Sequence, residues 1–206
     1  MRIGSNNWPL LGRRQRIGPV LGILLSLLLL PCLFAVDVAD GLKLLSEGKY
    51  AAAISAADKA LSEDRTDEDW TLIKVRAQMT TGKYAAALDV VTNAFRRYPL
   101  STSIRLKLLA KDVFLYNGFT DEAVKTIIEI NRLAGTRTWA YQDPVNIVTL
   151  GVAALELGAD PKLVLDRLFK PALKADDTIV ETHFAIANLA ISKGDYKMAA
   201  NQFRAG

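Results

Sequence analysis

The 206-residue sequence contains one cysteine and one histidine, and only 8% of its residues are aromatic. The single cysteine, Cys32, excludes a disulfide framework and any zinc site built on several thiolates. The single histidine, His183, excludes a multi-histidine metal centre. With 50% hydrophobic and 23% charged residues, the composition is otherwise that of a globular chain.

Acidic residues are absent from the first 35 positions, whereas four arginines lie there. The rest of the chain then carries 22 basic and 22 acidic residues, so the whole net charge of +4 lies in the N-terminal segment. Nucleic-acid binding would require a basic face on the folded part of the chain, and the sequence predicts none.

An uncharged run of twenty residues, 17–36, follows the arginines and precedes Asp37 and Asp40. A basic flank, a leucine-rich centre and an acidic flank are typical of an export signal. We therefore predict that residues 1–35 form a signal peptide. The remaining chain is then expected outside the cytoplasm, in the periplasm or cell envelope.

Three outcomes stay open for this segment. Cleavage after Ala35 is the favoured one. The run is also long enough to cross a ~30 Å hydrocarbon layer, so an uncleaved signal anchor over about residues 17–36 would attach the protein to the membrane. Lipidation is the third, because Cys32 resembles the cysteine of a bacterial lipoprotein signal, although Pro31 departs from the small residue that such signals place before it.

An internal repeat organises the chain after this segment. Residues 48–53 and 82–87 both read Gly-Lys-Tyr-Ala-Ala-Ala, and residues 194–199 are a looser copy. Glycines recur 34, 36, 40 and 36 residues apart, at Gly48, Gly82, Gly118, Gly158 and Gly194. This period predicts about five units, the last apparently truncated: 36–66, 67–100, 101–136, 141–176 and 177–206.

Each unit is predicted to be a pair of helices with the glycine between them, which makes the fold class all-α. Apolar residues three and four apart give each helix one apolar face. Gly82 is expected to end a helix in the left-handed conformation, and Pro99 to stop the next. Ser101 or Ser103 would then cap the following helix, and Asp160 with Pro161 would start a helix of the fourth unit.

This pattern resembles the tetratricopeptide repeat (TPR), a helix-turn-helix unit whose stacked copies form a right-handed solenoid of antiparallel helix pairs. The third unit departs from it with Thr120 in place of the elbow tyrosine. The fourth departs more, with Leu163 where alanine belongs and Pro171 interrupting its second helix. The residues that carry the resemblance are Gly41 and Gly151, the Gly-x-Tyr elbows at 48/50, 82/84 and 194/196, the small residues Ala53, Ala60, Ala87, Ala94, Ala123 and Ala199, and Pro99.

No motif for chemistry is present in the sequence: it has no GxxxxGK[ST] phosphate loop, HExxH, GxSxG or GxGxxG. We therefore predict no enzyme activity, no catalytic or metal-binding residue and no cofactor. His183 is expected to be a capping or partly buried packing residue. The acidic cluster over residues 64–69 lacks the glycine and terminal glutamate of a calcium loop, so Thr66 or Asp67 is expected to cap a helix there.

The resemblance implies that the first helix of each unit lines a concave groove that binds a protein or peptide. Such a groove would be mainly apolar, with arginines that suit a peptide or helix with an acidic or carboxylate end. It lacks the array of Lys and Asn by which some family members bind a C-terminal carboxylate. The groove candidates are Leu72, Arg76, Met79, Arg105, Leu108, Asp112, Leu115, Val148, Val152, Phe184 and Asn188.

The favoured function is thus an exported TPR scaffold without catalysis of its own. The sequence stops within the second helix of the fifth unit, with no polar helix to cover it, so we expect a fragment. The alternative is an N-terminal accessory region of a larger envelope enzyme, a hydrolase or peptidase, whose catalytic domain lies beyond Gly206. Self-association through the uncapped repeat is a third prediction.

Overall fold

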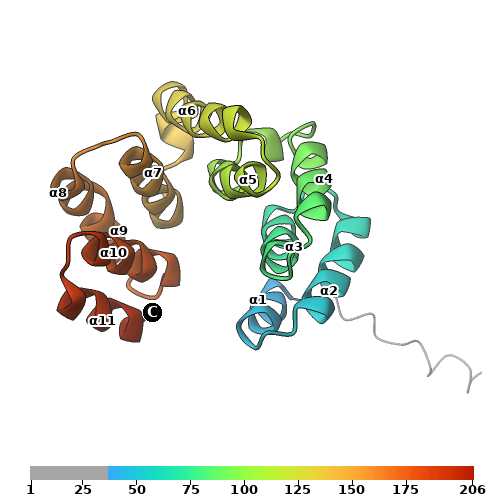
Figure 1. Cartoon of the computed structure of the whole chain (residues 1–206), viewed down its shortest axis with the longest axis horizontal. Coiled ribbons are helices and arrows are strands. Elements are labelled where there is room, and N and C mark those ends of the chain that lie inside the picture. The colour runs from blue at the N-terminus through green and yellow to red at the C-terminus, as the bar shows by residue number, and fades with distance from the viewer. Residues whose placement is uncertain (1–36) are drawn as a thin grey trace, which may run out of the picture. The chain divides into compact units, whose positions relative to one another are not determined.

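The computed structural model describes residues 37–206; the predicted signal peptide or anchor and Cys32 lie outside the described residues. The described part of the chain is helical and contains no β-strand, so the all-α prediction is confirmed. Its helices follow one another as pairs (Figure 1). The first three pairs are α1 (Val38–Ser46) with α2 (Tyr50–Glu63), α3 (Glu68–Thr80) with α4 (Tyr84–Ala94), and α5 (Ile104–Tyr116) with α6 (Thr120–Thr136).

The later pairs are less regular. A short 3₁₀ turn, η2 (Leu100–Thr102), precedes α5, and another, η3 (Thr138–Ala140), follows α6. The second helix of the fourth pair has three consecutive parts, of which the middle one is π-helical. These pairs are α7 (Pro144–Glu156) with α8 (Pro161–Val164), η4 (Leu165–Phe169) and α9 (Lys170–Ala175), and α10 (Val180–Ser192) with α11 (Tyr196–Ala205).

A glycine with positive φ separates the two helices of every pair, and Gly82 shows how it works. Its φ of 72° is accessible without strain because glycine has no Cβ. The turn lets the amide of Gly82 donate to the carbonyl of Met79 at 3.1 Å and the amide of Lys83 donate to that of Gln78 at 2.8 Å. These bonds satisfy the last carbonyls of α3 and reverse the chain direction, as the sequence predicted.

Side-chain caps fix the starts of the helices. Asp67 Oδ1 accepts from the amide of Trp70 at 2.9 Å, and Ser103 Oγ accepts from that of Leu106 at 2.9 Å. Asp160 Oδ1 likewise accepts from the amide of Lys162 at 2.7 Å. Among the capping alternatives, Asp67 and Ser103 are therefore the capping residues of α3 and α5, and the Asp160 prediction is confirmed.

The helix around Pro171 differs in part from the prediction of an interruption. Proline has no amide hydrogen and its ring clashes with the preceding turn of an α-helix. In the structure the chain widens into the π-helical segment η4 immediately before this residue and then continues as α9 to Ala175. The α-helical pattern is therefore interrupted before the proline, but the helical run does not end there and continues through Pro171.

The longest glycine spacing, 40 residues from Gly118 to Gly158, comes mainly from α6, which has 17 residues where α4 has 11; the connection between α6 and α7 follows it. Tyr141, in this connection, is 8% exposed, and its hydroxyl donates to the carbonyl of Thr102 at 2.8 Å. The bond ties the connection to η2, so the extra residues are accommodated while α7 still packs on α5 and α6.

Candidate functional site

The first helices of the pairs line a shared concave groove of about 880 Å³. Side chains from α1, α3, α5, α7 and α10 contribute to it, together with Tyr50 at the start of α2. Eight of the eleven sequence-predicted residues lie on this surface: Arg76, Arg105, Leu108, Asp112, Val148, Val152, Phe184 and Asn188.

The middle of the groove is apolar. Leu108 of α5 and Val152 of α7 are partly buried, and Val148 is almost fully buried at 3% exposure. Phe184 of α10 is 44% exposed and packs against Phe203 with ring centroids 5.5 Å apart. A surface of this composition can bury apolar side chains of a bound chain.

An ion pair crosses the groove from α3 to α10. Arg76 Nη1 lies 3.7 Å from Glu181 Oε1, and both side chains remain about two-fifths exposed, at 40% and 43%. An exposed pair at this separation contributes little to stability, roughly 0–1 kcal/mol. Both charges are therefore accessible to a ligand at little cost to the fold.

Arg105, predicted as the second cationic contact of the groove, also forms ion pairs that hold two helices together. Its Nη1 donates to Asp69 Oδ1 at 2.9 Å and lies 3.6 Å from Glu68 Oε2, which joins α5 to the start of α3. The acidic cluster thus has two functions: Asp67 caps α3, and its two neighbours hold Arg105. Arg105 is already neutralised by protein carboxylates and is a poorer ligand contact than Arg76.

Asp112 is also paired within the protein. Lys111 Nζ lies 2.9 Å from Asp112 Oδ1 and 2.7 Å from Glu156 Oε1 of α7. Burial by itself lowers the pKa of Lys111, but hydrogen bonds to Glu156 and Asp112 outweigh it and raise the pKa above its ordinary value. Lys111 therefore stays charged and bridges the third and fourth pairs.

Residues 44–111 match the family model of the tetratricopeptide repeat. A crystal structure of a thermophilic TPR protein from Thermus thermophilus is 20% identical, with 81% of this chain and 86% of that chain covered and a TM-score of 0.53. The fold is a tetratricopeptide-repeat solenoid. MamA 41-end from Desulfovibrio magneticus RS-1 is 16% identical, over 82% of this chain and 91% of that chain, with a TM-score of 0.41. No curated protein matches the chain.

Three predicted residues lie outside the groove of the TPR solenoid. Leu72 is 3% exposed and belongs to the core cluster with Val75 and Leu106, where it cannot reach a ligand. Met79 is partly buried and packs against the same cluster. Leu115 is 45% exposed but does not line the groove. Met79 and Leu115 occupy equivalent positions 36 residues apart, three before the elbow glycine; at the same position of α1, Leu45 does line the groove.

The structure adds groove residues that the sequence analysis missed. Leu42 and Ser46 of α1 line it, and each lies 34 residues before a groove residue of α3, Arg76 or Thr80. Applying the repeat spacing to Arg76 and Met79 would have found Leu42 and Leu45, but not Ser46, because Thr80 was not predicted. Lys43 and Glu181 also line the groove. They lie beside apolar positions on their helices, and no sequence signal distinguished them.

Within the described part of the solenoid, no group of three or more His, Cys, Asp or Glu is placed to hold a metal ion. Of the helices described, none has the combined length and apolar character needed to cross a membrane.

His183 is a buried packing residue at the end of the solenoid, as predicted. It is 6% exposed, with Nε2 2.8 Å from the carbonyl oxygen of Asp177 and Nδ1 2.8 Å from Gln202 Oε1. The hydrogen bond to the Asp177 carbonyl, followed by that to Gln202, raises the pKa of His183 above its ordinary value because both favour the imidazolium. The ring thereby joins α11 to α10 and to the loop before it.

Stability is expected to fall as this imidazolium deprotonates. A raised folded-state pKa contributes stability that is fully present below the unfolded pKa of about 6.5 and is lost as the pH rises through the folded value. We expect a lower melting temperature at about pH 8 than at about pH 6, followed by circular dichroism. The His183→Gln variant should lose this difference, since the chain has no other histidine. An equal pH dependence in the variant would contradict the assignment.

Proposed function

We propose that this protein is an exported scaffold that binds a partner protein or peptide through its concave groove, with no chemistry of its own. The observation that carries the proposal is the groove itself: five helices from five successive pairs contribute to one surface of about 880 Å³. Solenoids present such extended concave surfaces because each repeat adds one helix to the same face.

The partner is expected to combine apolar side chains with an acidic group. Leu108, Val152 and Phe184 offer apolar surface in the groove, and Arg76 and Lys43 add positive charge to its lining. Lys43 is exposed and makes no ion pair within residues 37–206. A ligand carboxylate near Arg76 would replace the 3.7 Å contact with Glu181 by a shorter, bidentate one. An amphipathic helix or an extended acidic peptide meets these requirements.

The export part of the proposal is supported by the sequence of the N-terminal segment. Four arginines precede the uncharged run, and the first carboxylate, Asp37, follows it directly. The positive-inside preference then places the arginines on the cytoplasmic side and the solenoid beyond the membrane. The partner is accordingly expected among proteins of the periplasm or cell envelope.

Charge reversal at Arg76 tests the groove. The Arg76→Glu variant places a carboxylate beside Glu181 and should reduce capture of the partner from an envelope extract by roughly tenfold or more. The matched control is Arg65→Glu, which makes the same change of charge at an exposed residue outside the groove. Captured proteins are identified by mass spectrometry. A partner that both variants capture as well as the wild-type protein would refute the groove assignment.

A further inference from the structure

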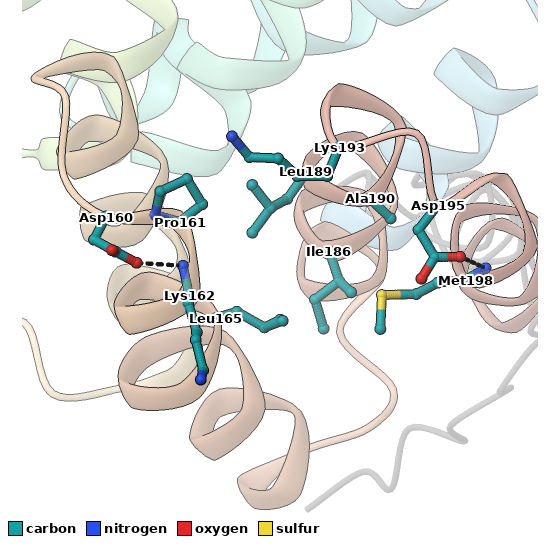
Figure 2. A pocket seen from close by; sticks show the side chains of 10 residues that line it. All are labelled: Asp160, Pro161, Lys162, Leu165, Ile186, Leu189, Ala190, Lys193, Asp195 and Met198. Atoms are coloured by element: carbon teal, nitrogen blue, oxygen red, sulfur yellow. Dashed lines mark hydrogen bonds between the residues drawn. The ribbon is translucent and has the colours of Figure 1, made fainter.

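A second opening lies on the solenoid away from the concave groove. It has a volume of about 400 Å³ and lies between the helix formed by α8 and η4 on one side and α10 with α11 on the other. Figure 2 shows the facing side chains of Leu165 and Ile186 and the sulfur of Met198 beside them. We call this opening the outer notch; its apolar lining is Leu165, Ile186, Leu189, Ala190 and Met198.

The repeat register shows that the outer notch is an altered version of a surface present elsewhere in the chain. The elbow glycines Gly82 and Gly194 are 112 residues apart, and the same offset relates Lys74, Gln78 and Ala86 to Ile186, Ala190 and Met198. The first three line a polar groove of about 600 Å³ between α2, α3 and α4, where Lys74 pairs with Asp58.

The equivalent positions of the third pair are apolar. An offset of 36 residues relates Lys74 and Gln78 to Ala110 and Phe114, and both belong to the buried core. Ile186 and Ala190 of the fifth pair are buried too, at 3% and 4% exposure, but an opening lies over them, whereas the surface of the second pair is polar and internally paired. Concave openings with a mainly apolar lining are typical of ligand sites.

Two carboxylates and two lysines lie at the rim of the notch: Asp160, Asp195, Lys162 and Lys193. Asp195 Oδ1 accepts from the amide of Met198 at 2.9 Å, and Asp160 caps α8 in the same way. These carboxylates are therefore occupied by helix N-termini. Lys193 is exposed, makes no ion pair among residues 37–206, and extends from the end of α10 across the opening toward Pro161 (Figure 2).

We propose that the outer notch binds the C-terminal end of a partner polypeptide whose last residue is apolar. The final side chain enters the notch, and the terminal carboxylate pairs with Lys193. The volume of about 400 Å³ lies within the range for ligand pockets, roughly 300–1,000 Å³, near its lower end. This site uses different residues and a different face from the concave groove, so either can exist without the other.

Methyl NMR of the full chain tests the proposal at a single residue. The described residues contain two methionines, of which Met198 lines the notch and Met79 does not. With ¹³C-methyl methionine labelling, a short peptide ending in Leu-Phe with a free carboxylate should shift the Met198 signal and leave that of Met79 unchanged. The same peptide with a C-terminal amide should bind roughly tenfold more weakly, since it lacks the charge. Equal binding of acid and amide would overturn the proposal.

A fatty acid serves as a second ligand in the same titration, because dodecanoate also combines an apolar chain with a carboxylate. A shift of Met198 with dodecanoate but not with the peptide acid would overturn the assignment to a polypeptide end. No Met198 shift with either ligand would overturn the site.

Charge reversal at the rim completes the test. Lys193→Glu should weaken binding of the peptide acid roughly five- to tenfold, because it replaces an attraction with a repulsion. Lys197→Glu is the matched control: it makes the same change of charge at an exposed residue of α11 that does not line the notch, and should bind as the wild-type protein does. Wild-type affinity in the Lys193→Glu variant would refute the carboxylate contact.

Discussion

Replacing Phe169 with alanine is expected to lower the free energy of unfolding by about 3–5 kcal/mol. Phe169 is fully buried and lies in the core of the fourth and fifth pairs with Val148, Ala172 and Ile186. Its ring packs directly on Gly151 of α7, where a Cβ would collide with it. Truncation leaves a cavity that the surrounding helices can close only in part, so the lost contacts are not regained.

Chemical denaturation measures this effect, and Gly151 provides a double-mutant cycle. Gly151→Ala alone should cost about 1–3 kcal/mol through overpacking against the ring. In the Phe169→Ala background that collision is gone, so the same change should cost little or nothing. Additive costs in the double variant would contradict direct packing of the ring on Gly151. Leu163→Ala, at a side chain that is 55% exposed, is the control and should change stability by less than about 0.5 kcal/mol.

Replacing Trp70 with alanine is expected to cost about 3–5 kcal/mol and to release the first helix pair. Trp70 is 4% exposed and lies in the core cluster shared by α2 and α3, with Ala53, Ala57 and Ile73. A Cβ on Gly41 of α1 would lie 2.5 Å from Cζ3 of its ring. The indole therefore connects the first pair to the second.

Hydrogen exchange locates this effect along the chain. In a solenoid each pair is stabilised mainly by its neighbours, so amides of α1 and α2 should lose protection while those of α5 to α7 keep it. The control is Trp139→Ala, at a side chain that is 75% exposed and should leave the exchange pattern unchanged. Uniform loss of protection along residues 37–206 would contradict a pairwise arrangement and indicate one cooperative unit.

The concave groove and the outer notch differ in whether equivalent repeat positions line them along the whole chain. In the concave groove the same positions recur in successive first helices, as Arg76, Asp112, Val152 and Asn188 show. Their side chains differ in charge and polarity at each repeat, so the groove can distinguish ligands along its length. The outer notch instead lies between the fourth and fifth pairs, where apolar Ile186 stands at the position that Lys74 occupies in the second pair.

Much of the fold could be predicted from the sequence because its signals are local. A glycine that must adopt positive φ, a capping carboxylate and apolar residues three and four apart each act within a few residues. Gly82 acts in the structure as predicted, and Asp67 and Ser103 are each one of the two capping residues that the local sequence allowed. The repeat spacing then identified the solenoid.

The pairing of charges required the tertiary structure. Arg76 and Glu181 are more than a hundred residues apart in the chain, and only the packing of successive pairs brings them to 3.7 Å. Arg105 was predicted from its repeat position to contact a ligand, yet the neighbouring pair supplies Asp69 to neutralise it. Leu72 likewise occupies a groove position in the repeat but is buried in the core.

The sequence by itself therefore determined the all-α class, the repeat and the starts of several helices, because local backbone geometry and apolar periodicity decide these features; it did not determine where α4 ends, which is at Ala94 and not at Pro99. The tertiary structure alone decided which equivalent side chains face a ligand, which face the core and which charges are paired. Those outcomes depend on how neighbouring pairs pack against one another, and the residues that control this packing, such as Gly151 and Phe169, lie on different helices.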